Sequence, residues 1–393
     1  MKRRLRDLAF AFLLAGTGLL GTGAPAAGAE GFGGPLPGLP APLRVAFRFG
    51  QARFGRVETP ATGLGPVFNG RSCLECHSHP APGGTGVGPE TRVVRFGSHS
   101  PGRPFDPLTG LGGPTLQRHS VAGEVPGCHL AGEVVPPEAN VVGLRQPPPL
   151  FGIGLMEAIP ASTILAHADP DDVNGDGIAG RPNLVGGRLG RFGWKAAEPG
   201  LLGFVGLALR NELGVTNFLF RDELPPQGQP IPPGCKLTRD PEDQGARLVG
   251  LYAFLAYLAP PPRGPLSPVV LRGERRFAEV GCAGCHIPTL RTGLHPVAAL
   301  RQRDVPLYSD LLTHYMGEPL NDGIPEGRAG GGRWRTAPLW GLRVRTRFLH
   351  DARAASLLEA IQLHAGEARE VRRRFFGLSA ADRTDLLAFL QSL

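Results

Sequence analysis

Two short cysteine motifs constrain this chain of 393 residues more than any other feature. Each has the order Cys-x-x-Cys-His, and the second begins 209 residues after the first. Two thiols at this spacing can reach the two vinyl groups of one porphyrin, and the histidine that follows then lies under the iron as an axial ligand. The predicted attachment residues are Cys73, Cys76, Cys282 and Cys285, and the predicted axial ligands are His77 and His286.

A zinc site or a redox disulfide is the alternative for a bare Cys-x-x-Cys pair. Zinc, however, needs four ligands and does not require a histidine directly after each second cysteine. Both motifs have that histidine, so the sequence predicts two covalently bound c-type haems. The remaining Cys128 and Cys235 form an even pair, which predicts a disulfide in an oxidising compartment; two free buried thiols are the alternative.

The first 29 residues have the order of a secretory signal peptide. Residues 2–6 are mostly basic, residues 8–21 are apolar, and residues 27–29 (Ala-Gly-Ala) provide a small-residue cleavage site. We therefore expect a periplasmic or otherwise exported protein. The apolar run is short for a membrane span, so an uncleaved anchor is the lesser alternative, and no other segment is long enough to cross a bilayer.

Composition argues against several other classes of protein. The 58 Gly and 41 Pro are incompatible with a long coiled coil or a regular helical bundle. The formal charge is +8, and removal of four cations and Asp7 with the signal peptide leaves +5. The basic residues are almost all arginine and are not clustered with aromatic residues, so no nucleic-acid partner is expected.

The sequence around the two motifs repeats. Residues 67–72 lead into the first motif and residues 275–281 lead into the second. Each half then closes with apolar residues at helical spacing, at 246–260 and at 380–393. A helix before Cys-x-x-Cys-His and a closing helix packed across it are the plan of a small cytochrome domain.

We therefore predict a mainly α fold with extensive Gly/Pro-rich loops and two cytochrome c-like domains in tandem, each with one covalent haem. The boundary is the proline-rich segment 260–265, which cannot continue a helix. The expected N-terminal domain covers 30–259 and contains a long loop insertion at 80–240. The expected C-terminal domain covers 260–393.

Several separated segments resemble the bacterial di-haem cytochrome c peroxidase superfamily, and most closely its di-haem oxidoreductase, or thiol oxidoreductase, branch. The segments that carry the resemblance are 145–160, 191–196, 308–317, 334–342 and 348–368, together with the closing helix. The resemblance extends from about Val67 to the C-terminus. One departure is Ala352, where the family pattern has Gly after His-Asp, so the backbone of that loop is in question.

The resemblance implies that the sixth iron ligand of the second haem lies on the helix after the His-Asp pair at 350–351. Counting along the chain places His364 there, and Met316 and His314 are its rivals. The non-ligand alternative for His364 is a helix-surface histidine near Glu367. A His–His iron would have a lower reduction potential than a His–Met iron.

For the first haem the sequence offers four candidate sixth ligands, and we assign none of them. The candidates are His79, His99, His119 and His129. His79 lies too near the axial His77 along the chain to reach the opposite face of the porphyrin easily. An open or exchangeable iron would be the reactive one, because peroxide must reach it.

The resemblance also implies two catalytic residues. Glu157 lies where relatives place the distal pocket, and it would move a proton between the oxygens of peroxide. The alternative for Glu157 is pairing with Arg145 or with a backbone N–H. Trp194 would carry electrons between the haems, as a tryptophan does in relatives, and an ordinary core tryptophan is the alternative.

Residues 169–183 contain the start of a calcium loop, with Gly177 at the sharp turn. The usual glutamate at the twelfth position is replaced by Asn183, which predicts lower affinity or a last ligand from elsewhere. A metal-free, Asx-rich turn is the alternative. The expected Ca²⁺ ligands are Asp172, Asn174, Asp176 and the carbonyl group of Ile178.

Together these features predict an exported di-haem redox enzyme. One haem would react with hydrogen peroxide or oxidise a protein or thiol substrate, and the other would exchange electrons with a small redox protein. The alternative is a non-catalytic di-haem electron carrier with two six-coordinate irons. The long insertion around Glu157 and the unequal ligand supply of the two halves favour the enzyme.

Overall fold

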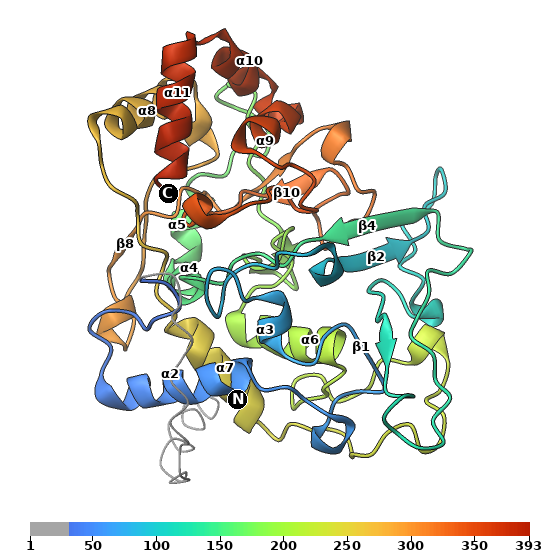
Figure 1. Cartoon of the computed structure of the whole chain (residues 1–393). Helices are drawn as coiled ribbons and strands as arrows, with labels where there is room; N and C mark the ends of the chain where they lie inside the picture. The colour runs from blue at the N-terminus through green and yellow to red at the C-terminus, as the bar shows by residue number, and fades with distance from the viewer. Residues whose placement is uncertain (1–30) are drawn as a thin grey trace.

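A computed structural model describes residues 31–393 of the chain (Figure 1). The expected signal peptide at 1–29 lies outside the described residues. Within the part of the chain that is described, no helix combines the length and the apolar character needed to cross a bilayer.

Two helix pairs mark the two halves of the chain. In the N-terminal half, α2 (Ala41–Phe54) packs against α7 (Ala246–Ala256). In the C-terminal half, α8 (Pro268–Glu279) packs against α11 (Ala380–Gln391). Figure 1 shows the two pairs at opposite ends of the molecule. The helices α7 and α11 confirm the two closing helices expected from the apolar spacing.

The sequence explains where α8 and α11 begin. The hydroxyl oxygen of Ser267 accepts the N–H of Val270, and that of Ser379 accepts the N–H of Asp382. Pro268 then occupies the first helical position, where its missing N–H removes no hydrogen bond within the helix. Both helices of the C-terminal pair therefore carry a local start signal.

Each helix pair crosses at a glycine. A Cβ atom on Gly50 of α2 would lie 2.0 Å from the carbonyl oxygen of Gly250 in α7. A Cβ atom on Gly273 of α8 would lie 1.9 Å from the carbonyl oxygen of Asp385 in α11. Real atoms do not approach this closely, so only glycine lets the two backbones pack at these distances.

Aromatic rings beside each crossing repeat the same arrangement. Phe54 packs on Phe254 with 4.9 Å between ring centroids, and Phe277 packs on Phe389 at 5.2 Å. Phe54 and Phe277 also lie 6.3 Å and 6.4 Å from the histidine ring of the adjacent cysteine motif. The helix pair, the crossing glycine and the motif histidine thus occur twice in one spatial order.

The approach to the first motif differs from the expected one. In the C-terminal half, α8 ends just before Cys282, but α2 ends 19 residues before Cys73. The residues directly before the first motif instead form strand β1 (Val67–Phe68), which pairs with β3 (His119–Ser120) of the long insertion. The expectation of a similar lead-in at 67–72 is therefore wrong, because the insertion recruits these residues into a ladder.

The remaining elements are short, apart from α6. The other helices are α3 (Cys73–Cys76), α4 (Ile153–Ala158), α5 (Ala161–Leu165), α6 (Leu201–Leu213), α9 (Leu357–Leu363) and α10 (Arg369–Gly377). The described strands form five two-stranded antiparallel ladders and no larger sheet. Besides β1 with β3, they are β2 (Val93–Gly97) with β4 (Val141–Arg145), β5 (Leu184–Val185) with β6 (Arg188–Leu189), β7 (Leu290–Arg291) with β8 (Asp304–Val305), and β9 (Thr313–Tyr315) with β10 (Arg333–Arg335). Helices joined by extensive loops dominate, as the sequence predicts.

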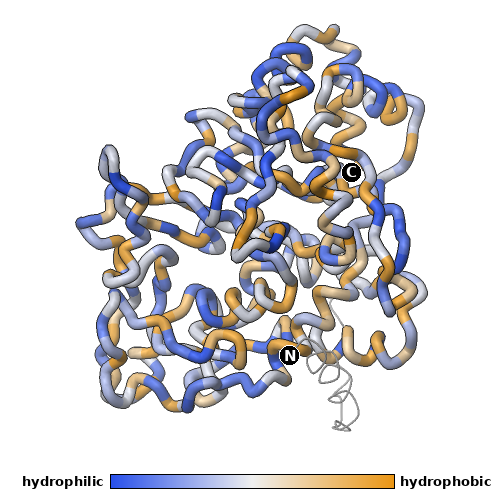
Figure 2. Tube along the Cα trace, turned by 180° about the vertical axis from the view of Figure 1, so that it is seen from behind, coloured by the Kyte–Doolittle hydropathy of each residue, from blue (hydrophilic) through white to orange (hydrophobic). Residues whose placement is uncertain are grey.

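The largest apolar core crosses the proline-rich segment between the halves. It is built mainly from α2, α4, α6 and α7, but Leu290, Leu300, Val305 and Leu307 of the C-terminal half belong to it as well. A second core, around Phe277, is confined to the C-terminal half. Figure 2 shows several apolar segments in the middle of the molecule. The two halves therefore share buried apolar surface.

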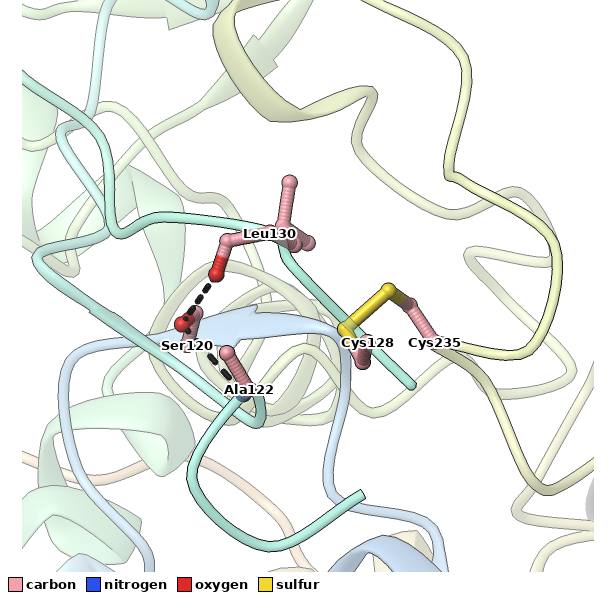
Figure 3. Close-up of a disulfide and its surroundings, with 5 residues drawn as sticks. All are labelled: Ser120, Ala122, Cys128, Leu130 and Cys235. Carbon is pink, nitrogen blue, oxygen red and sulfur yellow. Dashed lines mark hydrogen bonds between the residues drawn. A yellow bond between two sulfur atoms is a disulfide. The ribbon is translucent and has the colours of Figure 1, made fainter. Parts of the chain in front are cut away.

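A third, smaller apolar cluster surrounds a disulfide between Cys128 and Cys235 (Figure 3). Both cysteines are buried, and they join parts of the long insertion that are 107 residues apart. Nearby, the hydroxyl of Ser120 donates to the carbonyl oxygen of Leu130 at 2.6 Å. The structure confirms the expected disulfide and excludes the alternative of two free thiols.

Candidate functional site

The two cysteine motifs have the same local backbone. His77 donates its backbone N–H to the carbonyl oxygen of Cys73 at 3.0 Å, and His286 does the same to Cys282 at 3.0 Å. The first motif forms the one-turn helix α3, and the second forms a 3₁₀ turn at Cys282–Gly284. All four motif cysteines are free thiols, so they are available for a thioether bond.

The two motif histidines are held in the same way. The Nδ1 atom of His77 donates to the carbonyl oxygen of Gly84 at 3.0 Å, and Nδ1 of His286 donates to that of Tyr308 at 2.9 Å. Burial lowers the pKa of each imidazole to about 4, so both rings are neutral at pH 7. A proton fixed on Nδ1 leaves the lone pair on Nε2, which is the form that binds iron.

A large cavity lies against the second motif. It has a volume of about 1380 Å³, including the part open to solvent, and Cys282, Cys285 and His286 line it. Its mainly apolar walls and its free thiols therefore fit a haem group.

His364 lines the same cavity, at the C-terminal end of α9. Its Nδ1 donates to the carbonyl oxygen of Ala360 at 2.7 Å, which leaves the Nε2 lone pair free. Burial lowers the pKa of His364, so the ring is neutral. The cavity therefore brings together His286 and the expected sixth ligand, and the role of His364 as an iron ligand stays a prediction.

The two rivals of His364 also line this cavity, but they are held differently. His314 bonds to Asp310 through Nε2 at 2.8 Å and to Glu367 through Nδ1 at 2.7 Å. Burial acts to lower the pKa of His314, but its hydrogen bonds to the neighbouring groups outweigh burial and raise it well above the usual value. Both ring nitrogens are therefore engaged, whereas Met316 remains a competitor of His364 within the cavity.

Trp194 lies where two cavities meet. It lines the large cavity and also a second, smaller one, and its indole N–H donates to the carbonyl oxygen of Gln146 at 2.8 Å. Pro148, whose backbone carbonyl lies beside the ring of His77, lines the second cavity. Trp194 thus stands between the cavity of the second motif and the surroundings of the first.

Glu157 has structural partners. Its carboxylate accepts the N–H of Leu201, the first residue of α6, at 2.8 Å and the hydroxyl of Tyr252 at 3.2 Å. It lines neither of the two cavities described above. Arg145 pairs with Asp322 instead of Glu157. Pairing with a backbone N–H, the alternative stated for Glu157, is therefore present, and its catalytic role stays a prediction.

None of the four candidate sixth ligands of the first haem gains support. His99, His119 and His129 are exposed residues of the insertion, the second of them in strand β3. His79 uses Nε2 to donate to the carbonyl oxygen of Val344 at 3.0 Å, which ties the first motif to the C-terminal half.

In the acidic loop at 169–183, side-chain oxygens accept hydrogen bonds from backbone N–H groups of the same loop. Asn174 accepts the N–H of Asp176, Asp176 accepts that of Ile178, and Asp172 accepts that of Gly177, at 2.8–3.2 Å. These bonds form the Asx-rich turn stated as the alternative. The side chain of Ile178 lines the large cavity. Calcium binding here stays a prediction.

The loop with the departure from the family pattern keeps its shape. Ala352 has φ of 63°, in the left-handed region that favours glycine. The backbone is therefore the one that a glycine would adopt at this position, and alanine accepts the strain.

Sequence reasoning missed a buried polar group beside the large cavity. Trp334 and His350 line the cavity and stack at 3.6 Å between ring centroids. Lys195, which is fully buried, lies 4.2 Å from the centre of the Trp334 ring and bonds to Asp322 at 3.1 Å. Trp334, His350 and Lys195 fall in segments that carry the family resemblance, but nothing in their spacing indicates the stack.

A known protein family and several solved structures are similar to this chain. The family model described as "Di-haem oxidoreductase, putative peroxidase" matches residues 133–393. No curated protein sequence matches the chain.

Three solved structures are similar at low identity, and none of them carries an argument about function. Hydrazine synthase of Kuenenia stuttgartiensis is 16% identical, with a TM-score of 0.41 over 96% of this chain and 99% of that one. A MauG-like protein associated with microbial copper homeostasis is 14% identical, with a TM-score of 0.40 over 88% and 89%. The diheme peroxidase BthA of Burkholderia thailandensis is 16% identical, with a TM-score of 0.42 over 89% and 86%. The family match covers well over half of the chain, which therefore belongs to the di-haem oxidoreductase family.

Proposed function

We propose that the chain is an exported di-haem c-type cytochrome that acts as a redox enzyme. It would reduce hydrogen peroxide or oxidise a protein or thiol substrate, and exchange electrons with a small redox protein. Membership of the family implies two haems and a redox activity. The observation that carries the finer proposal is the position of Trp194, in the wall shared by the cavity of the second motif and the cavity near the first.

The residues present fit two covalently held haems. Cys73 and Cys76 would hold one and Cys282 and Cys285 the other, with the neighbouring histidines as axial ligands. The haem iron, when bound, supplies exchange of one electron at a time. The chain contributes neutral imidazoles with a fixed tautomer and apolar walls that exclude water.

The two sites would have different tasks. His364 faces the second motif across a shared cavity, which supports a six-coordinate iron that transfers electrons. Three of the four histidines considered for the first motif are exposed and the fourth is hydrogen-bonded to a backbone carbonyl, which supports an open, reactive iron there. Trp194 would connect the two. If Glu157 moves protons, it must first leave Leu201 and Tyr252.

The location and the metal requirement belong to the proposal as well. The disulfide supports an oxidising compartment, in agreement with the expected signal peptide and a periplasmic or exported location. Calcium at 169–183 would require Asp172 and Asp176 to exchange backbone hydrogen bonds for metal contacts.

Spectroscopy of the purified full chain, loaded with calcium, tests the proposal. Electron paramagnetic resonance and optical spectra would be recorded as isolated and half-reduced, each with and without peroxide. A high-spin ferric signal that peroxide removes is expected for the enzyme. Two low-spin haems that do not change in any state would contradict the proposal and support the electron carrier instead.

A further inference from the structure

Arg345 is a half-buried cation whose guanidinium lies 5.8 Å from the centre of the Phe348 ring but forms no hydrogen bond or ion pair among the described residues. It follows the 3₁₀ turn Leu342–Val344 and lines both the large cavity and the second cavity. Its Nε and Nη2 atoms are shielded from solvent and have no hydrogen-bond partner among the described residues. Shielded guanidinium nitrogens that form no hydrogen bond are costly, and the Phe348 ring offers them no acceptor oxygen, so they point to a group that completes the site.

Other buried arginines in the structure are at least partly satisfied. Arg335, in the same wall, donates through Nε to the carbonyl oxygen of Gly193 at 2.9 Å. Arg191 donates through Nη1 to three backbone carbonyls, the shortest bond being 2.5 Å to Ile159. Arg345 differs from both, because no described side chain or carbonyl group accepts from it.

No carboxylate among the described residues offsets the charge of Arg345. Burial lowers its pKa to about 10, and no carboxylate acts on it in the opposite direction. The guanidinium of Arg345 is therefore still positively charged at pH 7. By contrast, Asp310 raises the pKa of the neighbouring Arg335, against the larger effect of burial. The ligand that fits Arg345 is therefore an anion.

A second unsatisfied polar atom lies on the same cavity. The hydroxyl oxygen of Thr336 is buried without a partner and lines the large cavity with Arg345. The remaining walls are largely apolar, with Leu339, Leu342 and Phe348 nearby in the chain. A ligand that is apolar over most of its surface and carries a carboxylate would satisfy both groups.

Two hydrogen bonds hold the residues directly before Arg345 in place. The carbonyl oxygen of Val344 accepts a hydrogen bond from His79 of the N-terminal half at 3.0 Å. Arg343 donates to the carbonyl oxygen of Pro262 at 3.1 Å. The two residues before Arg345 are thus anchored to the first motif and to the linker, so the guanidinium is preorganised at the boundary of the cavities.

We propose that Arg345 binds a propionate carboxylate of the haem in the large cavity, with the Thr336 hydroxyl as a second donor. This inference rests on the proposed function only in its need for a haem at the second motif. The guanidinium would form a charge-assisted pair with the carboxylate, and its positive charge near the iron would raise the reduction potential of that haem.

The test compares Arg345→Gln and Arg345→Lys with Arg347→Gln, an exposed arginine two residues further along the chain. The readouts are the propionate bending bands in resonance Raman spectra and the reduction potentials from spectroelectrochemical titration. Arg345→Gln should shift the bands and lower the potential of the C-terminal haem, because loss of a cation favours the ferric state. Arg345→Lys should keep most of the potential but still shift the bands, since an ammonium lacks the two-donor fork. Arg347→Gln should match the wild type.

Unchanged bands and potentials in Arg345→Gln would overturn the inference. If that variant does not fold, Arg345→Lys decides, and unchanged propionate bands in it would overturn the inference equally. A free anion at Arg345 would instead make the wild-type potential depend on phosphate concentration at constant ionic strength, which also contradicts the proposal. A wild-type chain with two haems that ignores peroxide would overturn the enzymatic function alone, whereas a chain without covalent haem would overturn both.

Discussion

Three histidines of the large cavity are held in two different ways. His286 and His364 each use Nδ1 to donate to a backbone carbonyl, which leaves Nε2 as a free ligand atom. His314 has both nitrogens engaged by carboxylates. Sequence spacing could single out His364 as a candidate, but it could not separate it from His314, because hydrogen-bond partners far along the chain make the difference.

Replacement of His364 tests its role as an axial ligand. His364→Ala should convert the C-terminal haem from low spin to high spin, because the position opposite His286 then has no imidazole. His364→Met should stay low spin and raise the potential by on the order of 0.1 V, within the roughly 0.8 V span that axial ligands control. Electron paramagnetic resonance and redox titration measure both effects, with the exposed His167→Ala as the control. A low-spin His364→Ala variant would point to Met316 as the ligand.

Three carboxylates around one lysine make stability depend on pH. Glu223, Asp240 and Glu242 all contact the ammonium of Lys236. Burial raises the pKa of Glu223 to about 7, against the effect of Lys236 and with the help of the other two carboxylates. The folded state therefore retains a proton that the unfolded state loses, so stability is full below the unfolded pKa of 4.5 and decreases as pH rises toward 7.

Glu223→Gln should remove this dependence. Between pH 5 and pH 8 the wild type is expected to lose about 2 kcal/mol more stability than the variant, or about 3 °C in the thermal midpoint of a chain of this length. Thermal unfolding followed by circular dichroism at both pH values measures the difference. Glu138→Gln, on an exposed side chain, serves as the control. Parallel pH profiles of Glu223→Gln and wild type would contradict the raised pKa of Glu223 as the source of the pH dependence.

Other single-residue roles show the limit of pattern reading. The spacing of Asp172, Asn174 and Asp176 is the same for a calcium loop and for an Asx-rich turn, and only the backbone N–H groups that these side chains accept distinguish them. Arg345 appears in the sequence as one of many arginines. Its importance lies in two shielded nitrogen atoms with no described hydrogen-bond acceptor, which depends on the tertiary structure.

The helix pairs are the elements that the sequence predicts best. Apolar residues at helical spacing placed α7 and α11 correctly, because a helix packed on one face must repeat that spacing. The partner α2 was not predicted, since it is separated from its motif by residues that join a strand of the insertion. Long-range pairing of this kind leaves no local pattern.

The glycine crossings should tolerate no added methyl group. Gly273→Ala would place Cβ against the Asp385 carbonyl, so we expect a loss of about 2–3 kcal/mol, although alanine favours a helix by about 1 kcal/mol elsewhere. Gly377→Ala, at the end of α10, has open space around its Cβ and should be neutral or slightly stabilising. Thermal unfolding of the two variants compares them directly. Equal midpoints would mean that the crossing can open without cost.

At the scale of the whole molecule, backbone hydrogen bonds join the halves. Gly293 donates to the carbonyl oxygen of Ala158, and Arg335 donates to that of Trp194, each at 2.9 Å. Lys195 of the N-terminal half bonds to Asp322 of the C-terminal half. The sequence indicated a tandem repeat with a linker, but it could not show that the apolar residues between 290 and 312 complete the core of the other half.

We expect the shared core to hold the two halves together even after the chain is cut between them. Insertion of a protease recognition sequence between Pro265 and Leu266 tests this prediction. Leu266 is exposed, so the inserted site should be cut without unfolding the chain. After cleavage, denaturing electrophoresis should show two fragments, while size-exclusion chromatography under native conditions shows one particle with unchanged haem spectra. Two separate peaks under native conditions would show that the shared core does not hold the halves together.

The large apolar core that spans the linker therefore has a consequence for how the protein can be divided. Its halves would behave as complementing fragments, each needing the other to cover its apolar surface. A C-terminal fragment expressed alone would expose Leu290, Val305 and Leu307 to water and would self-associate. The chain can be cut as a polypeptide, but it cannot be separated as two soluble modules.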